Sequence, residues 1–597
     1  MHEQVPIGMP LSDPDQFHTA NDLLQAGLHG RLTRRDLLER AAQLGLATGV
    51  TAAILTATGP DVAATAPVTD GKKTKPAGKE IKDAEITVGV VGSIDTLNPW
   101  TTNLYAQGFD VLSGVMDALV GFDSRQRMKP LLAESFAISD DGLTYTFELR
   151  KDVIFQNGDP LTSADIVATW QTIMNQDMPT WSRLGWDKIS SIDTPSPTTA
   201  VIHTATIFAP FLSSIAAGSF SSGAIGPASI LTGDATAFRD QFGQKPIGTG
   251  PFRIKSVRKE SVILERYDKH WAGAARLKRI TVRLFDDFEG QLAALAAGEI
   301  QIAGRTGSPA DQHLEAALAI ADTTVLQFPG LTWGHLDLKN VGALAETDVR
   351  QALDFATPRT QIIEQVLANT AQPAAADQAP GSGYASQRIH PRPLDLDQSA
   401  AHLTSAGFTR AESGAWSRGG AALEIDLWGE QGDTQAEAIL TTIGKSWSAA
   451  GIATRINLAP ADVLWGPTGY QFNDRLTAGF YRWANVNDPD DMYYWHSSQI
   501  PTWPGGPGGN LLAYFNPFSF QSEIDDLTSR AAAQTDPVLR KNIYLQIQDL
   551  LHEQVPVIFL FWDYGYSAVS NTIGNYLPSA FTYLLWNARE WYQTEPE

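Results

Sequence analysis

Residues 131–162 read LLAESFAISDDGLTYTFELRKDVIFQNGDPLT. Within this stretch, Tyr145, Phe147 and Leu149 alternate with polar residues directly after an Asp-Gly turn. Alternation with a period of two places all three apolar side chains on one face of a strand. The sequence therefore predicts a half-buried strand that begins just after the turn.

A helix is predicted immediately downstream. The Gly-Asp-Pro triplet at 158–160 interrupts regular structure, and Thr162 and Asp165 have the spacing of a capping box. The apolar residues that follow at helical spacing are Ile166, Trp170, Ile173 and Met174.

Other parts of the chain alternate in type. Residues 85–90 have strand periodicity, as do residues 423–427 and 452–458, and residues 434–450 between the last two have helical periodicity. A strand–helix–strand order is typical of an α/β lobe.

Near the C-terminus, Asp536 and Pro537 predict the start of a helix that runs to Glu553. The apolar run 557–562 (VIFLFW) predicts a strand buried on both faces. Two segments rich in Pro and Gly, 372–393 and 501–510, are predicted to be loops.

Composition excludes several classes of protein. A chain of 597 residues is too long for one compact domain, so two or more lobes are expected. The 66 acidic residues outnumber 44 basic ones, giving a net charge of −22, which disfavours binding to nucleic acid or to anionic membranes. Cysteine is absent, which excludes disulfides, thiolate metal sites and cysteine nucleophiles.

Motifs of enzymes are incomplete wherever they begin. No serine has the Gly-x-Ser-x-Gly pattern of a nucleophile elbow. The triplet Gly444-Lys445-Ser446 lacks the leading glycine of a phosphate-binding loop, because Ile439 occupies that position. Pro556 stands where a zinc-protease helix starting at His552 needs its second histidine. We therefore expect no catalytic residue, no metal site and no cofactor.

The N-terminus predicts export. Arg34 and Arg35 precede an uncharged, weakly apolar segment at 41–57, a pattern similar to a twin-arginine signal spanning residues 1–66. Cleavage is expected after 62–64 or 64–66, and residues 67–83 form a linker. The mature protein is then expected in the periplasm or at the outer face of the cytoplasmic membrane.

Beyond residues 131–162, five further matches in the same order extend the pattern to almost the whole mature chain. They are 95–99 (DTLNP), 246–252 (PIGTGPF), 297–300 (AGEI), 348–353 (DVRQAL) and 555–558 (VPVI). Together these residues resemble the extracytoplasmic solute-binding proteins of ABC importers, in the dipeptide-, oligopeptide- and nickel-binding family.

This resemblance implies a two-lobed α/β periplasmic-binding-protein fold, hinged, with mixed sheets and an extra inserted subdomain. The first lobe would comprise 84–122, 245–330 and 555–597; the inserted subdomain 123–244; and the second lobe 331–554. Such a monomer closes around a short peptide or similar polar organic solute and delivers it to the permease subunits in the membrane. No nucleic-acid partner is implied.

The resemblance also indicates pocket residues. In the family, an aspartate that binds the ligand amine lies three residues after a Trp, but Val486 occupies that position after Trp483, so Asn485 or Asp488 would have to replace it. The remaining candidates lie in family loops or in the aromatic-rich second lobe: Asn98, Thr249, Gly250, Trp333, Trp428, Tyr481 and Trp483.

Two alternatives stay open. Because an uncharged side chain cannot provide the charge-assisted bond that an ammonium needs, the same scaffold could bind an opine, a sugar-containing solute or a metal chelate. The other alternative is an extracytoplasmic hydrolase built on a similar two-lobed frame.

Overall fold

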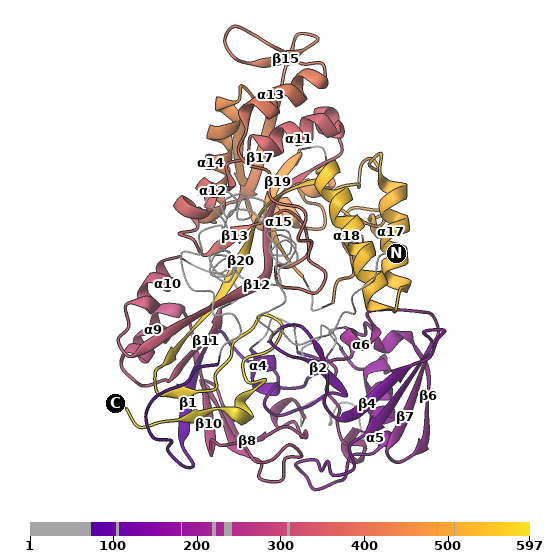
Figure 1. Ribbon diagram of the computed structural model, residues 1–597, viewed down its shortest axis with the longest axis vertical. Coiled ribbons are helices and arrows are strands. Elements are labelled where there is room, and N and C mark those ends of the chain that lie inside the picture. The colour runs from indigo at the N-terminus through magenta and orange to yellow at the C-terminus, as the bar shows by residue number, and fades with distance from the viewer. Residues whose placement is uncertain are drawn as a thin grey trace, which may run out of the picture. The chain divides into compact units, whose positions relative to one another are not determined.

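The computed structural model is shown in Figure 1. It describes residues 73–102, 107–180, 182–217, 222–231, 242–306, 311–473, 475–485, 488–506 and 508–596. The expected export signal at 1–66 lies outside the described residues. In the described part of the chain, we find no helix with the length and apolar character needed to cross a membrane.

The first part of the main sheet is built around β1 (Glu85–Val91), which confirms the strand predicted there. It pairs in parallel with β10 (Arg279–Phe285) and β11 (Ile302–Thr306). Two antiparallel strands, β9 (Ser261–Arg266) and β8 (Phe252–Arg258), extend this side of the sheet.

Residues 131–162 lie in and beside a separate antiparallel sheet, whose order is β4-β5-β7-β6. Its strands are β4 (Ala133–Ile138), β5 (Thr144–Leu149), β6 (Ile189–Ser196) and β7 (Thr199–Thr204). In β5, the three alternating apolar residues are buried, as the sequence predicted. The predicted helix is α5 (Ser163–Met174), where the backbone N–H of Thr162 donates to Asp165 Oδ2 at 2.6 Å.

The other end of the main sheet contains the predicted strand–helix–strand unit. Strands β17 (Glu424–Glu430) and β18 (Ala453–Ala459) pair in parallel, and α14 (Thr434–Ala449) joins them. Strand β19 (Ala478–Ala484) lies on the opposite side of β17. The predicted C-terminal helix is α18 (Pro537–Gln554), and Asp536 caps its N-terminus by accepting two backbone N–H groups. It packs beside α17 (Gln521–Ala533).

Two long strands connect the two ends of the sheet. β12 (Thr323–Leu338) and β20 (Val557–Ser570) run antiparallel along each other. Figure 1 shows that both extend from the part of the sheet that contains β11 to the part that contains β19. Their register shifts between Pro329, which faces Tyr564, and Trp333, which faces Trp562. The pairing of β12 with β20 is interrupted at this point, which divides the two paired strands into two halves.

The predicted strand at 557–562 is buried on both faces, which confirms the prediction. Val557 and Phe559 pack into one core and Ile558 and Leu560 into another. The sequence placed this strand in the first lobe, but it pairs with the half of β12 that also pairs with β19. The crossing to β11 comes later, after Asp563, because β20 is one continuous strand that serves both halves.

The predicted loops contain little regular structure. Gln372 and Pro373 belong to a short strand, β13 (Ala371–Pro373), which pairs with β20, so the first loop begins two residues later than predicted. The described residues of the second loop, 501–506 and 508–510, form neither helix nor strand.

Candidate functional site

Aromatic side chains cluster on one face of β12 and β19. The pairing of these strands places Trp333 opposite Trp483 and His335 opposite Tyr481. The rings of Trp333 and Trp483 meet edge to face at 5.2 Å, and Tyr494 stacks on Trp483 at 4.4 Å with 21° between the planes. Offset stacks and edge-to-face contacts are the preferred aromatic geometries. Trp333 is fully buried in this cluster, whereas Trp483 is half-buried at its edge.

A polar row lies beside the rings. The Tyr481 hydroxyl donates to Asp337 Oδ2 at 2.7 Å, and His335 Nε2 lies 3.3 Å from the other carboxylate oxygen. Burial and the neighbouring Asp337 charge raise the pKa of Tyr481, so its phenol stays protonated as a donor. The hydroxyl of Tyr481, a predicted ligand contact, is therefore hydrogen-bonded within the protein.

Asn485 joins the cluster to a distant loop. Its Oδ1 accepts the indole N–H of Trp333 at 2.9 Å, and its Nδ2 donates to the backbone carbonyl of Asp377 at 2.5 Å. Both ends of the amide thus fix the end of β19. The next two residues, including Val486, lie outside the described residues.

Asp488 forms two strong contacts with other side chains. Its Oδ1 accepts from Arg540 Nη1 and its Oδ2 accepts from Ser213 Oγ, both at 2.5 Å. Arg540 is almost completely buried in α18. The carboxylate that could have received a ligand amine is therefore already neutralised by a guanidinium.

The candidates from the first lobe hold turns together. Asn98 Oδ1 accepts the backbone N–H of Trp100 at 3.0 Å, and Thr249 Oγ1 donates to Asp117 Oδ2 at 2.9 Å. A Cβ on Gly250 would lie 2.6 Å from the Val115 carbonyl carbon, so only glycine permits this close approach.

The structure brings Trp333, Tyr481, Trp483 and Asn485 together. It places Trp428 in a separate small cluster, where its ring meets Tyr470 edge to face at 5.2 Å. The pairing of strands about 150 residues apart decides which candidates meet, and nothing local in the sequence signals it.

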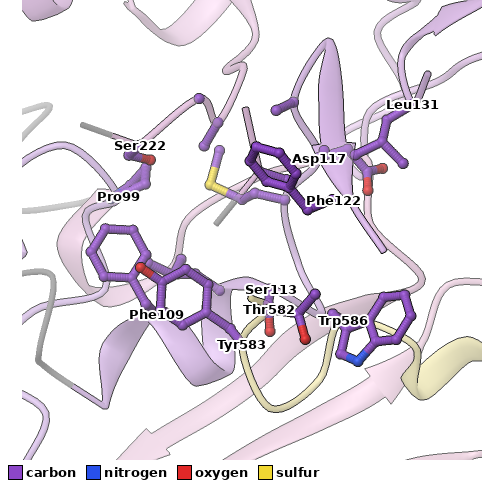
Figure 2. A pocket seen from close by; sticks show the side chains of 17 residues that line it. Pro99, Phe109, Ser113, Asp117, Phe122, Leu131, Ser222, Thr582, Tyr583 and Trp586 are labelled. Carbon is purple, nitrogen blue, oxygen red and sulfur yellow. The ribbon is translucent and has the colours of Figure 1, made fainter. Parts of the chain in front are cut away.

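A cavity that the sequence did not predict, with a volume of about 110 Å³, is lined by residues from 99–131, 217–224 and 582–586 (Figure 2). Phe109 of α4 (Gly108–Leu112) stacks on Tyr583 on one side, 5.1 Å between centroids, and Phe122 lies on the opposite side. The other lining residues are Pro99, Leu112, Ser113, Met116, Asp117, Ala118, Gly121, Leu131, Ala217, Ser222, Gly223, Ala224, Thr582 and Trp586.

This cavity is largely apolar, and Asp117 is the one charged residue in its described lining. The Asp117 carboxylate is oriented by Thr249 and by the indole N–H of Trp271, which donates at 3.0 Å. A pocket of this size holds roughly one phenyl or branched aliphatic group. In the sequence, the apolar residues among 115–120 show no pattern that separates a cavity lining from an ordinary core.

These features define a class of protein. The described residues contain no group of three or more His, Cys, Asp or Glu side chains placed to hold a metal ion. Two sheet halves joined by a pair of crossing strands, with aromatic rings gathered where the strands change register, are the architecture of a two-lobed binding protein.

Comparison with known proteins agrees with this class. Residues 127–502 match the family model described as bacterial extracellular solute-binding proteins, family 5 Middle, and the chain belongs to this family. The oligopeptide-binding protein AppA of Bacillus subtilis is 25% identical over 84% of this chain and 90% of its own length. The glutathione-binding protein GsiB of Escherichia coli is 24% identical over 79% and 88%.

Solved structures confirm the predicted fold. NikZ from Campylobacter jejuni, in complex with Ni(L-His), has a TM-score of 0.66 at 22% identity, covering 86% of this chain and all of NikZ. AppA in complex with a nonapeptide has a TM-score of 0.63 at 22% identity, covering 87% of this chain and all of AppA. The chain is thus a solute-binding protein of the kind that serves ABC importers.

Proposed function

We propose that this protein captures a short peptide or comparable polar organic solute by hinge closure and delivers it, chemically intact, to a membrane permease. One observation carries the proposal: the register shift in the β12–β20 pair is followed at once by Trp333, the centre of the aromatic cluster. Rings placed beside the hinge of a closing protein are positioned to contact an enclosed ligand.

Similarity supports the ligand class. AppA is described as an oligopeptide-binding protein and GsiB as a glutathione-binding protein. The apolar cavity beside Asp117 suits a solute that combines an apolar group with a polar backbone. Roughly 100 Å² of buried apolar surface contributes about 2.5 kcal/mol, so several such contacts would support micromolar binding.

A non-peptide ligand is a second candidate, and a specific observation favours it. Asp488 is already paired with Arg540, and Asn485 is uncharged and bonded at both ends, so neither is free to receive an ammonium. The ligand of NikZ, a nickel chelate, shows how far solutes differ among proteins of similar fold. An opine, a sugar-containing solute or a metal chelate would not require that ammonium contact.

The remaining assignments are part of the same proposal. Residues 1–66 direct export through the twin-arginine route, and the mature protein acts as a monomer in the periplasm or at the outer face of the cytoplasmic membrane. The first lobe comprises 84–122, 245–330 and the residues after Asp563, the inserted subdomain 123–244, and the second lobe 331–563.

The decisive experiment is mass spectrometry of small molecules released when the exported protein is mildly unfolded. Recovery of di- to pentapeptides supports the first ligand class, and recovery of a single non-peptide solute supports the second. Each recovered compound is then added back to the stripped protein while small-angle scattering is recorded. A profile that does not contract with any of them, or conversion of a compound into product, would overturn the proposal.

A further inference from the structure

The inserted subdomain touches the second lobe at a contact separate from the two crossing strands. Ser213, in the one-turn helix α6 (Phe211–Ser214), donates to Asp488 Oδ2, and Asp488 follows β19 by only four residues. Figure 1 shows α6 next to the ends of α17 and α18. This contact links the subdomain, whose described residues contribute no strand to the main sheet, with the segment that carries Trp483 and Asn485.

The second-lobe side of the contact is rigid. Arg540 donates to Asp488 Oδ1 at 2.5 Å, to the carbonyl of Pro489 at 2.7 Å and to the Tyr384 hydroxyl at 3.0 Å. Tyr544 also donates to Pro489, at 2.6 Å. A carboxylate held this firmly presents its second oxygen in a fixed direction, which favours one geometry for an incoming donor.

The subdomain side is equally well supported. The Phe211 ring, fully buried, packs on Tyr145 of β5 with 4.5 Å between centroids, which fixes α6 on the subdomain sheet. Two residues earlier, the backbone N–H of Ala209 donates to the carbonyl of Ala532 at 2.8 Å. Ala532 lies in the last turn of α17, where carbonyls lack helical partners and accept donors from outside.

A third contact extends the same surface. A Cβ built on Gly142, in the turn before β5, would lie 3.2 Å from Thr535 Cγ2. The patch therefore combines the Ser213–Asp488 side-chain bond and the Ala209–Ala532 backbone bond with the proximity of Gly142 to Thr535.

We propose that the inserted subdomain takes part in solute capture by docking on the second lobe, with Ser213 and Asp488 as the latch of the closed state. This rests on hinge closure as the working motion of the protein. Because both lobes must approach for Ser213 to reach Asp488, the bond stabilises closure and opposes opening. Asp488 acts here as a positioning residue, which explains why its carboxylate is directed away from a ligand role.

The first test exploits the absence of cysteine from the whole chain. The double variant Ser213→Cys/Asp488→Cys carries the only two thiols, and a short bifunctional methanethiosulfonate should join them rapidly in the solute-free protein. The matched control is Ser190→Cys/Asp488→Cys, because Ser190 is exposed on β6 of the same subdomain. Joining no faster than in the control would overturn the latch.

A second variant keeps Asp488 in place. Ser213→Asp sets two carboxylates against each other, whereas Ser213→Asn retains a donor. Without solute, the scattering profile should be expanded for Ser213→Asp but not for Ser213→Asn. In Ser213→Asp, the amide of Ala209 should also exchange at least tenfold faster than in the natural protein. The melting temperature should be unchanged. A profile and exchange rate equal to those of the natural protein would also overturn the latch. Since neither test contains solute, failure of the latch is distinguishable from failure of solute binding.

Discussion

Gly330 lies directly against the backbone carbonyl of Asp563, at the point where β12 and β20 change register. A Cβ built on Gly330 would be 2.5 Å from the Asp563 carbonyl oxygen, a separation that no side chain tolerates without movement. Asp563 also accepts from Arg482 Nε at 3.2 Å, which ties the crossing point to β19. The close approach of two backbones thus marks where the two halves of the sheet are joined.

We expect Gly330→Ala to separate the crossing strands. Backbone atoms cannot relax as a flexible side chain would, so the free energy of unfolding should fall by about 1–3 kcal/mol, and the solute-free scattering profile should change. The matched control is Gly383→Ala, since a Cβ on exposed Gly383 would meet no atom within 4 Å. Equal melting temperatures for the two variants would show that the approach is not tight in solution.

Trp483→Ala should weaken solute binding and lower stability together. The ring contacts Trp333, Tyr494 and other aromatic side chains, so its loss removes packing as well as ligand surface. We expect at least a tenfold loss of affinity, measured by calorimetry with the recovered solute, and roughly 2 kcal/mol of stability. Trp503→Ala is the control, because Trp503 is 57% exposed. Unchanged affinity for Trp483→Ala would remove this ring from the site.

Local signals predicted much of the fold. Helices α5 and α18 were predicted from a cap residue followed by apolar spacing, and β5 from strict alternation. The point at which β20 passes from one half of the sheet to the other is hard to predict, because this strand is apolar and buried along almost its entire length. Neither hydrophobicity nor turn residues mark where such a strand changes neighbours.

The site was harder to predict. Trp333 and Trp483 were both candidates, but their meeting depends on the register between two distant strands. Asp488 was a candidate ligand contact because it could replace the family aspartate whose position Val486 occupies. Its partners in the structure, Ser213 and Arg540, lie 275 and 52 residues away, so no local pattern indicates them. Composition near a loop indicates which side chains are available, while long-range packing decides what they bind.

A buried pair of carboxyl groups should make stability depend on pH. Burial raises the pKa of Asp377 to about 6, and burial together with the charges of Asp377 and Asp490 raises the pKa of Asp491 well above its ordinary value. A raised pKa means that the native state binds a proton the unfolded chain releases. The stability contributed by the Asp377 proton is complete below about pH 4 and is lost as the pH rises through about 6. The melting temperature should therefore fall between about pH 4 and pH 6, and fall further at higher pH as Asp491 ionises.

Asp491→Asn tests this dependence. The amide removes one charge and can still accept from Gln378 Nε2, which donates to both Asp491 carboxylate oxygens. We expect the variant to be more stable than the natural protein at pH 8, by on the order of 2 kcal/mol, and to show a flatter slope. Asp526→Asn, at an exposed residue of α17, is the control. If melting temperature fell with pH as steeply in Asp491→Asn as in the natural protein, the Asp377–Asp491 pair would be excluded as the cause of the pH dependence.

Arg540→Lys should destabilise the second lobe more than its conservative character suggests. The guanidinium serves Asp488, Pro489 and Tyr384 at once, and its Nε also donates to the carbonyl of Ala531 at 3.1 Å. A lysine ammonium has three donors and no planar fork, so it leaves buried acceptors without a donor. Urea unfolding should show a loss of about 3 kcal/mol.

The control for this change is Arg530→Lys, which lies on the neighbouring helix and pairs with Asp526 at the surface. Exposed ion pairs contribute little to stability, so the free energy of unfolding of the control should stay within about 0.5 kcal/mol of that of the natural protein. The two variants carry the same chemical change and differ in burial and in the number of acceptors served. A loss for Arg540→Lys no larger than for Arg530→Lys would mean that Asp488 is held by its backbone alone, and that the latch does not depend on the guanidinium beneath it.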